Sequence, residues 1–150
     1  MIYLASDHAG YQLKEAIKKH LSERSFVVED CGAFTYDEND DYPDFIIPAA
    51  QKVGENPEGN KAIILGGSGQ GEAIAANKVR GVRAAVYYGG PLDLVKLSRS
   101  HNNANMLSLG AKFLTLEEAK EVVKLWLETG FDGGRHERRI EKIKTFEQGS

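Results

Sequence analysis

The chain has 150 residues, of which 41% are hydrophobic and 27% are charged, as is ordinary for one globular domain, and this excludes disorder as the main state. With 19 basic against 22 acidic residues, it lacks the basic excess of a nucleic-acid binder, and no stretch approaches the roughly 20 apolar residues of a membrane span. A single cysteine, Cys31, excludes an internal disulfide framework and is typical of a reducing compartment, so we expect a cytoplasmic protein.

Short apolar runs alternate along the chain with longer segments of helical character. In chain order, the runs that predict strands are 2–5, 26–28, 62–65, 83–88 and 106–109. The segments that predict helices are 12–22, a stretch that begins at Pro43, 71–79, 91–99, 115–127 and 135–146. Proline suits the first turn of a helix, and Thr115 with Glu118 forms a capping-box signature. Because the strands are continuous apolar runs with short connections, the pattern favours a parallel sheet covered on both faces, in a single domain over 1–150.

Glycine is concentrated in one place, residues 66–71 (Gly-Gly-Ser-Gly-Gln-Gly), between the third predicted strand and the next helix. In a parallel sheet this turn lies at the carboxyl edge, where ligands bind. Its backbone N–H groups can approach an anion closely, and the following helix adds its positive end. The sequence therefore predicts an anion-binding turn. The acidic segment 31–44, which follows the second strand, is either a solvated loop or a wall of the same site.

Two nucleotide-binding motifs fail at this turn. The dinucleotide fingerprint requires glycine where Glu72 or Ile74 stands, and the P-loop, which Gly66 and Gly71 fit, requires lysine where Glu72 stands and a hydroxyl at Ala73. Nucleotide phosphate is therefore poorly supported. A turn that holds an oxyanion while Glu72 acts as a base fits better. The alternative is that Glu72 only complements the helix dipole.

Other polar residues allow two interpretations each. His8 follows Asp7 at the end of the first strand, and His101 heads an asparagine-rich run; each is either a hydrogen-bonded turn residue or a site residue. Arg135 and Arg139 share one helical face and form either a solvated basic surface or an anion clamp, because guanidinium groups bind phosphate in a bidentate way. No metal-ligand spacing occurs, so we expect no metal site. No role beyond solubility is expected for four lysines, Lys18, Lys19, Lys142 and Lys144.

Five short segments together resemble a known family. In chain order they are 7–10 (Asp-His-Ala-Gly), 41–43 (Asp-Tyr-Pro), 66–78, which contains the glycine turn, 101–103 (His-Asn-Asn) and 133–136 (Gly-Gly-Arg-His). In order and spacing they resemble the type B ribose-5-phosphate isomerases, whose wider family includes galactose-6-phosphate isomerases. The resemblance covers essentially the whole chain. It implies a three-layer α/β sandwich around a five-stranded parallel sheet, of Rossmann or flavodoxin-like type.

The same resemblance implies an aldose–ketose isomerase, an intramolecular oxidoreductase that interconverts ribose 5-phosphate and ribulose 5-phosphate through a cis-enediol without metal or cofactor. It further implies a homodimer with active sites at the subunit interface, in which helix 135–146 packs on the partner subunit. A higher oligomer is left open. Alternatives are another substrate, galactose 6-phosphate or allose 6-phosphate, or a non-enzymatic nucleotide-sensing module.

The resemblance also implies roles for single residues. Asp7 orients the sugar, His101 assists ring opening and Ser68 contacts the sugar oxygens. Substrate-binding groups, some of them supplied by the partner subunit, are Gly67, Gly69 and Gly71 of the turn, Tyr42 and Asn102 beside the sugar, and His8, Arg135 and Arg139 at the phosphate, with Lys112 where many members carry arginine.

Many members of this family carry a cysteine, the proton-transferring base, at the position of Gly66. Here that position has no side chain, and Cys31 lies in another segment. A second subset of the family is similar to this chain, with glycine at that position and a glutamate at the position of Glu72. We therefore assign the base to Glu72.

Overall fold

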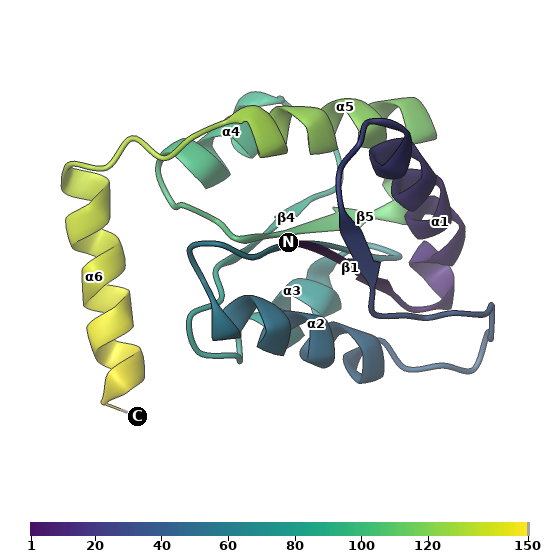
Figure 1. Ribbon diagram of the computed structural model, residues 1–150, viewed down its shortest axis with the longest axis horizontal. Coiled ribbons are helices and arrows are strands. Elements are labelled where there is room, and N and C mark those ends of the chain that lie inside the picture. Colours follow the sequence, from purple (N-terminus) through teal and green to yellow (C-terminus); the bar gives the residue numbers. More distant parts are fainter. Residues whose placement is uncertain (150) are drawn as a thin grey trace.

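The computed structural model describes residues 1–149, and its centre is one five-stranded parallel sheet in the order β2-β1-β3-β5-β4 (Figure 1). The strands are β1 (Ile2–Ser6), β2 (Val28–Asp30), β3 (Lys61–Gly66), β4 (Ala84–Tyr87) and β5 (Met106–Gly110). The helices are α1 (His8–Glu23), α2 (Pro43–Glu55), α3 (Gln70–Ala76), α4 (Asp93–Ser100), α5 (Leu116–Glu128) and α6 (Arg135–Gln148), with a 3₁₀ turn, η1 (Ala111–Phe113), after β5. The predicted fold class is confirmed.

Two hydrophobic cores lie on opposite faces of the sheet. Helices α1, α4 and α5 cover one face, and α2 and α3 cover the other (Figure 1). Because successive side chains of a strand point to opposite faces, Ile63 and Leu65 enter the first core, whereas Ala62 and Ile64 enter the second. Strands buried on both faces explain why the apolar runs are continuous rather than alternating.

The start of α1 lies four residues before the predicted one, at His8 rather than residue 12. Asp7 is the N-cap, and its carboxylate accepts hydrogen bonds from the backbone N–H groups of Ala9 at 3.0 Å and Gly10 at 3.4 Å. Gly10 also lets the helix approach β3, because a Cβ there would lie 2.7 Å from the backbone of Leu65. A capping aspartate and a close-packed glycine therefore extend the helix to the end of β1.

The second predicted strand was wrong by two residues, since β2 covers Val28–Asp30 rather than 26–28. Phe26 and Val27 are exposed, and pairing begins where Val28 lies beside Ile2. Helix α3 ends at Ala76 rather than 79, because the Asn77 side chain exchanges two hydrogen bonds with the backbone of Ala84 instead. The other predicted boundaries lie within two residues of the observed ones, and the capping box at Thr115 is confirmed.

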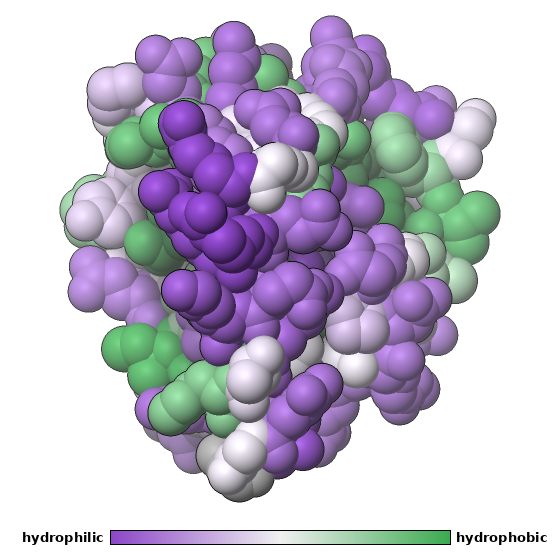
Figure 2. Space-filling view, turned by 90° about the vertical axis from the view of Figure 1, so that its left-hand side faces the viewer, coloured by the Kyte–Doolittle hydropathy of each residue, from purple (hydrophilic) through white to green (hydrophobic). Residues whose placement is uncertain are grey.

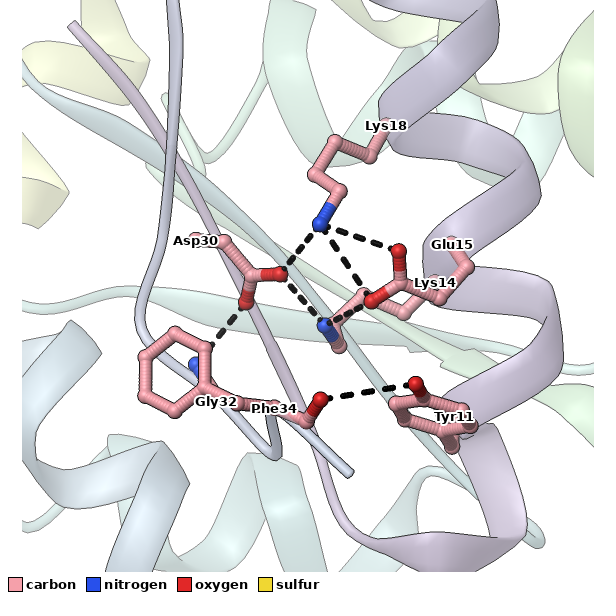
Figure 3. A network of polar contacts seen from close by, with 7 residues as sticks. All are labelled: Tyr11, Lys14, Glu15, Lys18, Asp30, Gly32 and Phe34. Atoms are coloured by element: carbon pink, nitrogen blue, oxygen red, sulfur yellow. Dashed lines mark hydrogen bonds and ion pairs between the residues drawn. The ribbon is translucent and has the colours of Figure 1, made fainter. Parts of the chain in front are cut away.

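A partly buried ion-pair network joins α1 to β2 (Figure 3). The side chain of Lys14 is fully buried, and its Nζ lies 2.7 Å from Asp30 Oδ2 and 3.0 Å from Glu15 Oε1. Lys18 Nζ contacts the same Asp30 oxygen at 2.8 Å, so the expectation that Lys18 serves solubility alone was wrong. The other Asp30 oxygen accepts a hydrogen bond from Gly32 N–H at 2.8 Å. The network therefore braces the start of the segment that follows β2.

All five strands run in the same direction, so the sheet has a carboxyl edge, where the strands end, and an amino edge, where they begin. Helix α6 lies outside the two helix layers, beside the amino edge (Figure 1). The segment that leads to it contains Gly133 and Gly134, both with positive φ, and Asp132 N–H donates to Ser100 O at 3.0 Å. Within residues 1–149, no helix is long and apolar enough to cross a membrane.

Candidate active site

The structure divides the predicted site residues between the two edges of the sheet. We call those at the ends of β1, β3 and β5 and after β2 the carboxyl-edge group: Asp7, His8, Tyr42, Gly67, Ser68, Gly69, Gly71, Glu72 and Lys112. We call those after α4 and on α6 the amino-edge group: His101, Asn102, Arg135 and Arg139. One chain therefore brings the members of each group together but does not bring the two groups to one place.

The glycine turn (residues 66–71) is pinned to β5 and η1. Gly69 adopts φ 79°, which favours glycine, and its carbonyl accepts a hydrogen bond from Ser108 Oγ at 2.6 Å. Lys112 N–H donates to Gly67 O at 3.0 Å. Ser68 is half-buried, and its Oγ accepts a hydrogen bond from Gln70 N–H at 3.3 Å. The predicted turn therefore has a fixed backbone before any ligand arrives.

Glu72 lies under this turn and is 4% exposed. Its carboxylate fills the space next to Gly66, because a Cβ at Gly66 would collide with both Glu72 oxygens. Burial raises the pKa of Glu72 above its ordinary value of 4.5; its own backbone N–H opposes that rise, and the charge of Asp7 adds to it. A carboxylate with a raised pKa is a stronger base that is still ionised once the pH exceeds that value.

Tyr42 and Lys112 flank the glycine turn. A Cβ at Gly71 would lie 2.7 Å from Tyr42 Cζ, and a Cβ at Gly67 would lie 3.2 Å from Lys112 Cε and 3.5 Å from its Nζ. The phenol ring therefore packs directly on the turn, and the exposed Lys112 places its ammonium group beside it. An anion on the turn would meet a positive charge at this point.

His8 is paired with Asp40, a residue that the sequence did not single out beyond its place in the acidic segment 31–44. His8 Nδ1 lies 2.6 Å from Asp40 Oδ1, and His8 N–H donates to the same oxygen at 3.0 Å. The hydrogen bond to Asp40 is the largest cause that raises the pKa of His8 above 6.5, burial opposes it, and the charges of Asp7 and Asp37 add to it. The ring is therefore biased towards its positively charged form.

Asp7, His8 and Asp40 also place potential ligand atoms within 4.8 Å of one another. One polar atom of each residue already has a partner, because Asp7 Oδ1 caps α1 and His8 Nδ1 is bonded to Asp40 Oδ1. The geometry is explained by hydrogen bonds without a cation, and the absence of a metal site stays a prediction.

The amino-edge group is held together by two stacked histidines. The ring of His101 lies 4.0 Å from that of His136, with an interplanar angle of 15°. Burial lowers the pKa of His136, and the neighbouring His101, Arg135 and Arg139 lower it further. Both arginines are exposed. The stack, which the sequence did not predict, joins the end of α4 to the start of α6 and gathers basic groups that suit an anion.

A hollow of about 450 Å³ lies at the same edge, between α6 and the start of β4. Its lining is mainly apolar and includes Val82, Ala85, Ile140, Ile143 and Phe146. The face of α6 that is turned away from the sheet is strongly hydrophilic, with hydrophobic surface on either side of it (Figure 2). This hollow is chemically unlike a sugar-phosphate site, whose ligand needs many polar partners.

Comparison with known proteins gives one consistent set of relatives. Residues 2–143 match the family model of the ribose/galactose isomerases. The chain is 43% identical to ribose-5-phosphate isomerase B of Mycobacterium leprae, over 98% of this chain and 90% of that protein. It is 44% identical to the probable ribose-5-phosphate isomerase B of Mycoplasma genitalium, over 98% and 95%. The crystal structure of the M. genitalium isomerase with bound ribulose-5-phosphate matches 99% of this chain and 97% of that chain with a TM-score of 0.95 at 43% identity.

Proposed function

The chain belongs to the ribose/galactose isomerase family, and from that premise we propose that it interconverts ribose 5-phosphate and ribulose 5-phosphate. The observation that carries the proposal is the match to a solved isomerase that holds ribulose-5-phosphate, at a TM-score of 0.95 and 43% identity over nearly the whole chain. The chemistry of the carboxyl-edge group also supports the proposed isomerisation. This group combines a fixed turn of backbone N–H groups with a buried carboxylate, as proton transfer next to a carbonyl requires.

The reaction moves one carbon-bound proton and one hydroxyl proton. After the furanose ring opens, Glu72 removes the proton from C2 of the aldose, and the electron pair of that C–H bond forms the enediolate. The same residue then returns the proton to C1, while a hydroxyl proton moves from O2 to O1 and C2 becomes the ketone. The backbone N–H groups of the glycine turn stabilise the negative charge that develops on the oxygens. Ser68 contacts these oxygens, and Asp7 orients the sugar.

Glu72 is supported as the base by its position and by the state of the rival residue. Its carboxylate occupies the space that a side chain at Gly66 would fill, and burial raises its pKa. Cys31 is half-buried beside the core under α2, and burial raises the pKa of its thiol above 9.0. A thiol in that state is a poor nucleophile and base at neutral pH. The single cysteine also agrees with the cytoplasmic location that we propose.

The active site is completed by a second copy of the chain. His101, Arg135 and Arg139 lie at the amino edge, whereas Glu72 and His8 lie at the carboxyl edge, so the first three side chains reach Glu72 only from a partner subunit. Exposed apolar side chains on α6 support a homodimer in which this helix packs on the partner, because Ile143 is 52% and Phe146 77% exposed. In a two-fold dimer the exchange is reciprocal, which gives two shared sites.

The substrate is tested by a coupled assay across sugar phosphates. We expect isomerisation of ribose 5-phosphate to exceed that of galactose 6-phosphate and allose 6-phosphate. A preference for a hexose phosphate would keep the isomerase and change its substrate. No turnover of any of them, together with a thermal shift in ATP or NAD, would favour the nucleotide-sensing alternative.

The shared site is tested by mixing two defective variants, Glu72→Gln and the double variant Arg135→Ala/Arg139→Ala, after unfolding and refolding them together. Half of randomly paired dimers are mixed, and each mixed dimer has one intact site, so activity at low substrate should return to about a quarter of the wild-type value. Each variant refolded alone is the control. Absence of recovery, with mixed dimers shown by differently tagged chains, would place the whole site in one subunit.

A further inference from the structure

The Asp40 carboxylate is hydrogen-bonded to one residue, His8. Its Oδ1 accepts both the backbone N–H of His8, at 3.0 Å, and the ring Nδ1, at 2.6 Å. Its Oδ2 is buried and has no hydrogen-bond partner among the described residues. The Asp40 side chain is only 9% exposed, whereas that of His8 is 31% exposed. A buried carboxylate with one partner is stabilised chiefly by a positive charge on that partner.

The segment that carries Asp40 is held in place by contacts well away from it. Asp30, whose carboxylate is paired with Lys14, accepts the N–H of Gly32 (Figure 3). Tyr11 Oη donates to Phe34 O at 3.4 Å, within the same view. These contacts join the loop to α1, the helix that begins with His8. These contacts, which are present without substrate, hold the loop so that Asp40 lies beside His8.

The pairing leaves one ring nitrogen for a ligand. Because Nδ1 is bonded to Asp40, Nε2 is the ring nitrogen left for a ligand. It donates when the ring is charged, whereas the neutral tautomer that Asp40 favours keeps its single proton on Nδ1. The charged groups around the ring are Asp7 on its own element and Asp37 and Asp40 on the loop, and the ring of Tyr36 lies edge-on at 6.2 Å. The acidic neighbours favour the imidazolium form, which is the form that attracts phosphate.

We propose that Asp40 is a positioning residue: through its hydrogen bond to Nδ1 it fixes the His8 ring and presents a protonated Nε2 to the phosphate of the substrate. The inference rests on the proposed function, in which His8 binds that phosphate. Asp40 does not touch the substrate in this account. Its loss should weaken binding of the ground state and the transition state alike, so the effect falls on KM rather than on kcat.

The test compares Asp40→Asn with Asp37→Asn, a matched control that removes an acidic charge from the same loop but not the hydrogen bond to His8. We expect Asp40→Asn to raise KM for ribose 5-phosphate by on the order of 10-fold, the loss typical of one charge-assisted hydrogen bond, with kcat nearly unchanged. In the pH profile of kcat/KM, the inflection that reports the titration of His8 should move to lower pH. Asp37→Asn should shift both quantities much less. An unchanged KM, or a loss confined to kcat, would overturn the proposal.

A second measurement works without turnover and so separates this proposal from the proposed function. An NMR titration of His8 in the free protein should show its pKa lowered towards 6.5 in Asp40→Asn, and inorganic phosphate should perturb the His8 signals less than in the wild type. A double-mutant cycle with His8→Gln separates positioning from a general loss of stability. Adding Asp40→Asn to His8→Gln should raise KM no further. A further rise in that background, or an unshifted His8 titration, would show that Asp40 acts only on the fold.

Discussion

The two edges of the sheet position their polar groups by different means. At the carboxyl edge, Glu72 is buried under the glycine turn, Asp7 caps a helix and His8 is bonded to Asp40. At the amino edge, Arg135 and Arg139 are exposed on a helix that lies outside the two layers. The chain therefore fixes the groups that we assign to proton transfer within its own fold. Apart from His8 and Lys112, the groups that we assign to ring opening and phosphate binding depend on a partner for their final environment.

This difference has a physical cause. A base is stronger when its pKa is raised, and burial together with a nearby like charge raises the pKa of Glu72. A phosphate clamp instead needs charged guanidinium groups that remain hydrated until the ligand arrives, because burying an unpaired charge is strongly unfavourable. We therefore expect changes at Glu72 to affect kcat, and changes at Arg135 and Arg139 to affect KM. The His8–Asp40 pair, which we assign to phosphate binding from the carboxyl edge, should also act on KM.

The largest expected effect at the carboxyl edge comes from removing the base. Glu72→Gln keeps the size of the side chain but cannot accept the proton, so kcat should fall by about 10²–10⁴-fold with KM largely retained. In the wild-type protein, activity should fall with decreasing pH through a pKa above 4.5, because burial raises the pKa of Glu72 and only its ionised form is a base. Steady-state kinetics across pH measure both quantities.

Cys31→Ser is the matched control for that variant. It should leave kcat nearly unchanged, and thiol-alkylating reagents should not abolish activity. Nearly normal turnover in Glu72→Gln, or a folded but inactive Cys31→Ser, would show that the base had been assigned to the wrong residue.

A change in the ion-pair network that joins α1 to β2 should lower the stability of the fold instead. Lys14→Met breaks a pair in which the lysine is fully buried and leaves Asp30 with Lys18 as its remaining charged partner, so it should lower the free energy of unfolding by about 3 kcal/mol, the lower end of the range for a broken buried pair. Burial raises the pKa of Asp30, but hydrogen bonds from Lys14, Lys18 and Gly32 outweigh it, so the net shift is downward from 3.8. The stabilisation that ionised Asp30 gives the folded state is therefore complete at neutral pH, and it is lost as the pH falls through the lowered pKa of Asp30.

Urea unfolding at neutral pH measures this loss, and Lys18→Met is the control. Lys18 shares Asp30 but its side chain is 34% exposed, so its removal should lower stability far less. Equal losses for the two lysines would mean that burial of Lys14 does not set the strength of the network.

How much of this was predictable depends on how local each feature is. The glycine turn and Glu72 occupy adjacent positions between a strand and a helix, so the sequence was enough to predict their place in the fold. The His8–Asp40 pair joins residues 32 positions apart, and nothing in the sequence indicates which of the acidic residues in 31–44 reaches the ring. Lys14 lies on an amphipathic helix, where lysine is normally exposed. Its burial follows only from the position of Asp30 at the end of β2.

The division of the site between two edges is a matter of topology. The resemblance indicated a dimer, but the sequence does not say which residues lie at which edge until the strand order is known. The stack of His101 on His136 was missed for the same reason, since α6 meets the end of α4 only in three dimensions. The error at β2 was of another kind: Phe26 and Val27 are apolar, yet they precede the first paired residue and are exposed.

A smaller effect is expected from Gly66→Ala, which tests whether Gly66 and Glu72 compete for one space. The added Cβ would collide with the Glu72 carboxylate, so the carboxylate must move, and a displacement of about 1 Å can lower kcat by about 10²-fold. Gly130→Ala is the control, because a Cβ there meets nothing within 4 Å. Unchanged kcat in Gly66→Ala would mean that proton transfer does not depend on this position of the carboxylate.

At the amino edge, Arg135→Ala and Arg139→Ala should each raise KM for ribose 5-phosphate. A charge-assisted hydrogen bond contributes about 1.5–3 kcal/mol, which corresponds to a rise of roughly 10- to 150-fold. Because both side chains are exposed, the midpoint of urea unfolding should not change. Arg138→Ala, on the same helix, is the control for charge alone. An unchanged KM in both variants would mean that this segment is a solvated basic surface.

The smallest effect is expected from removing metal ions, and it tests the carboxyl edge again. Asp7, His8 and Asp40 lie close enough together to hold a cation, but His8 Nδ1 and Asp7 Oδ1 already have hydrogen-bond partners. In the proposed reaction the N–H groups of the glycine turn stabilise the enediolate, so no Lewis acid is needed. Activity should therefore be unchanged after dialysis against EDTA. A loss that an added divalent ion restores would show that these three residues bind a metal and that the His8–Asp40 hydrogen bond is replaced in the working enzyme.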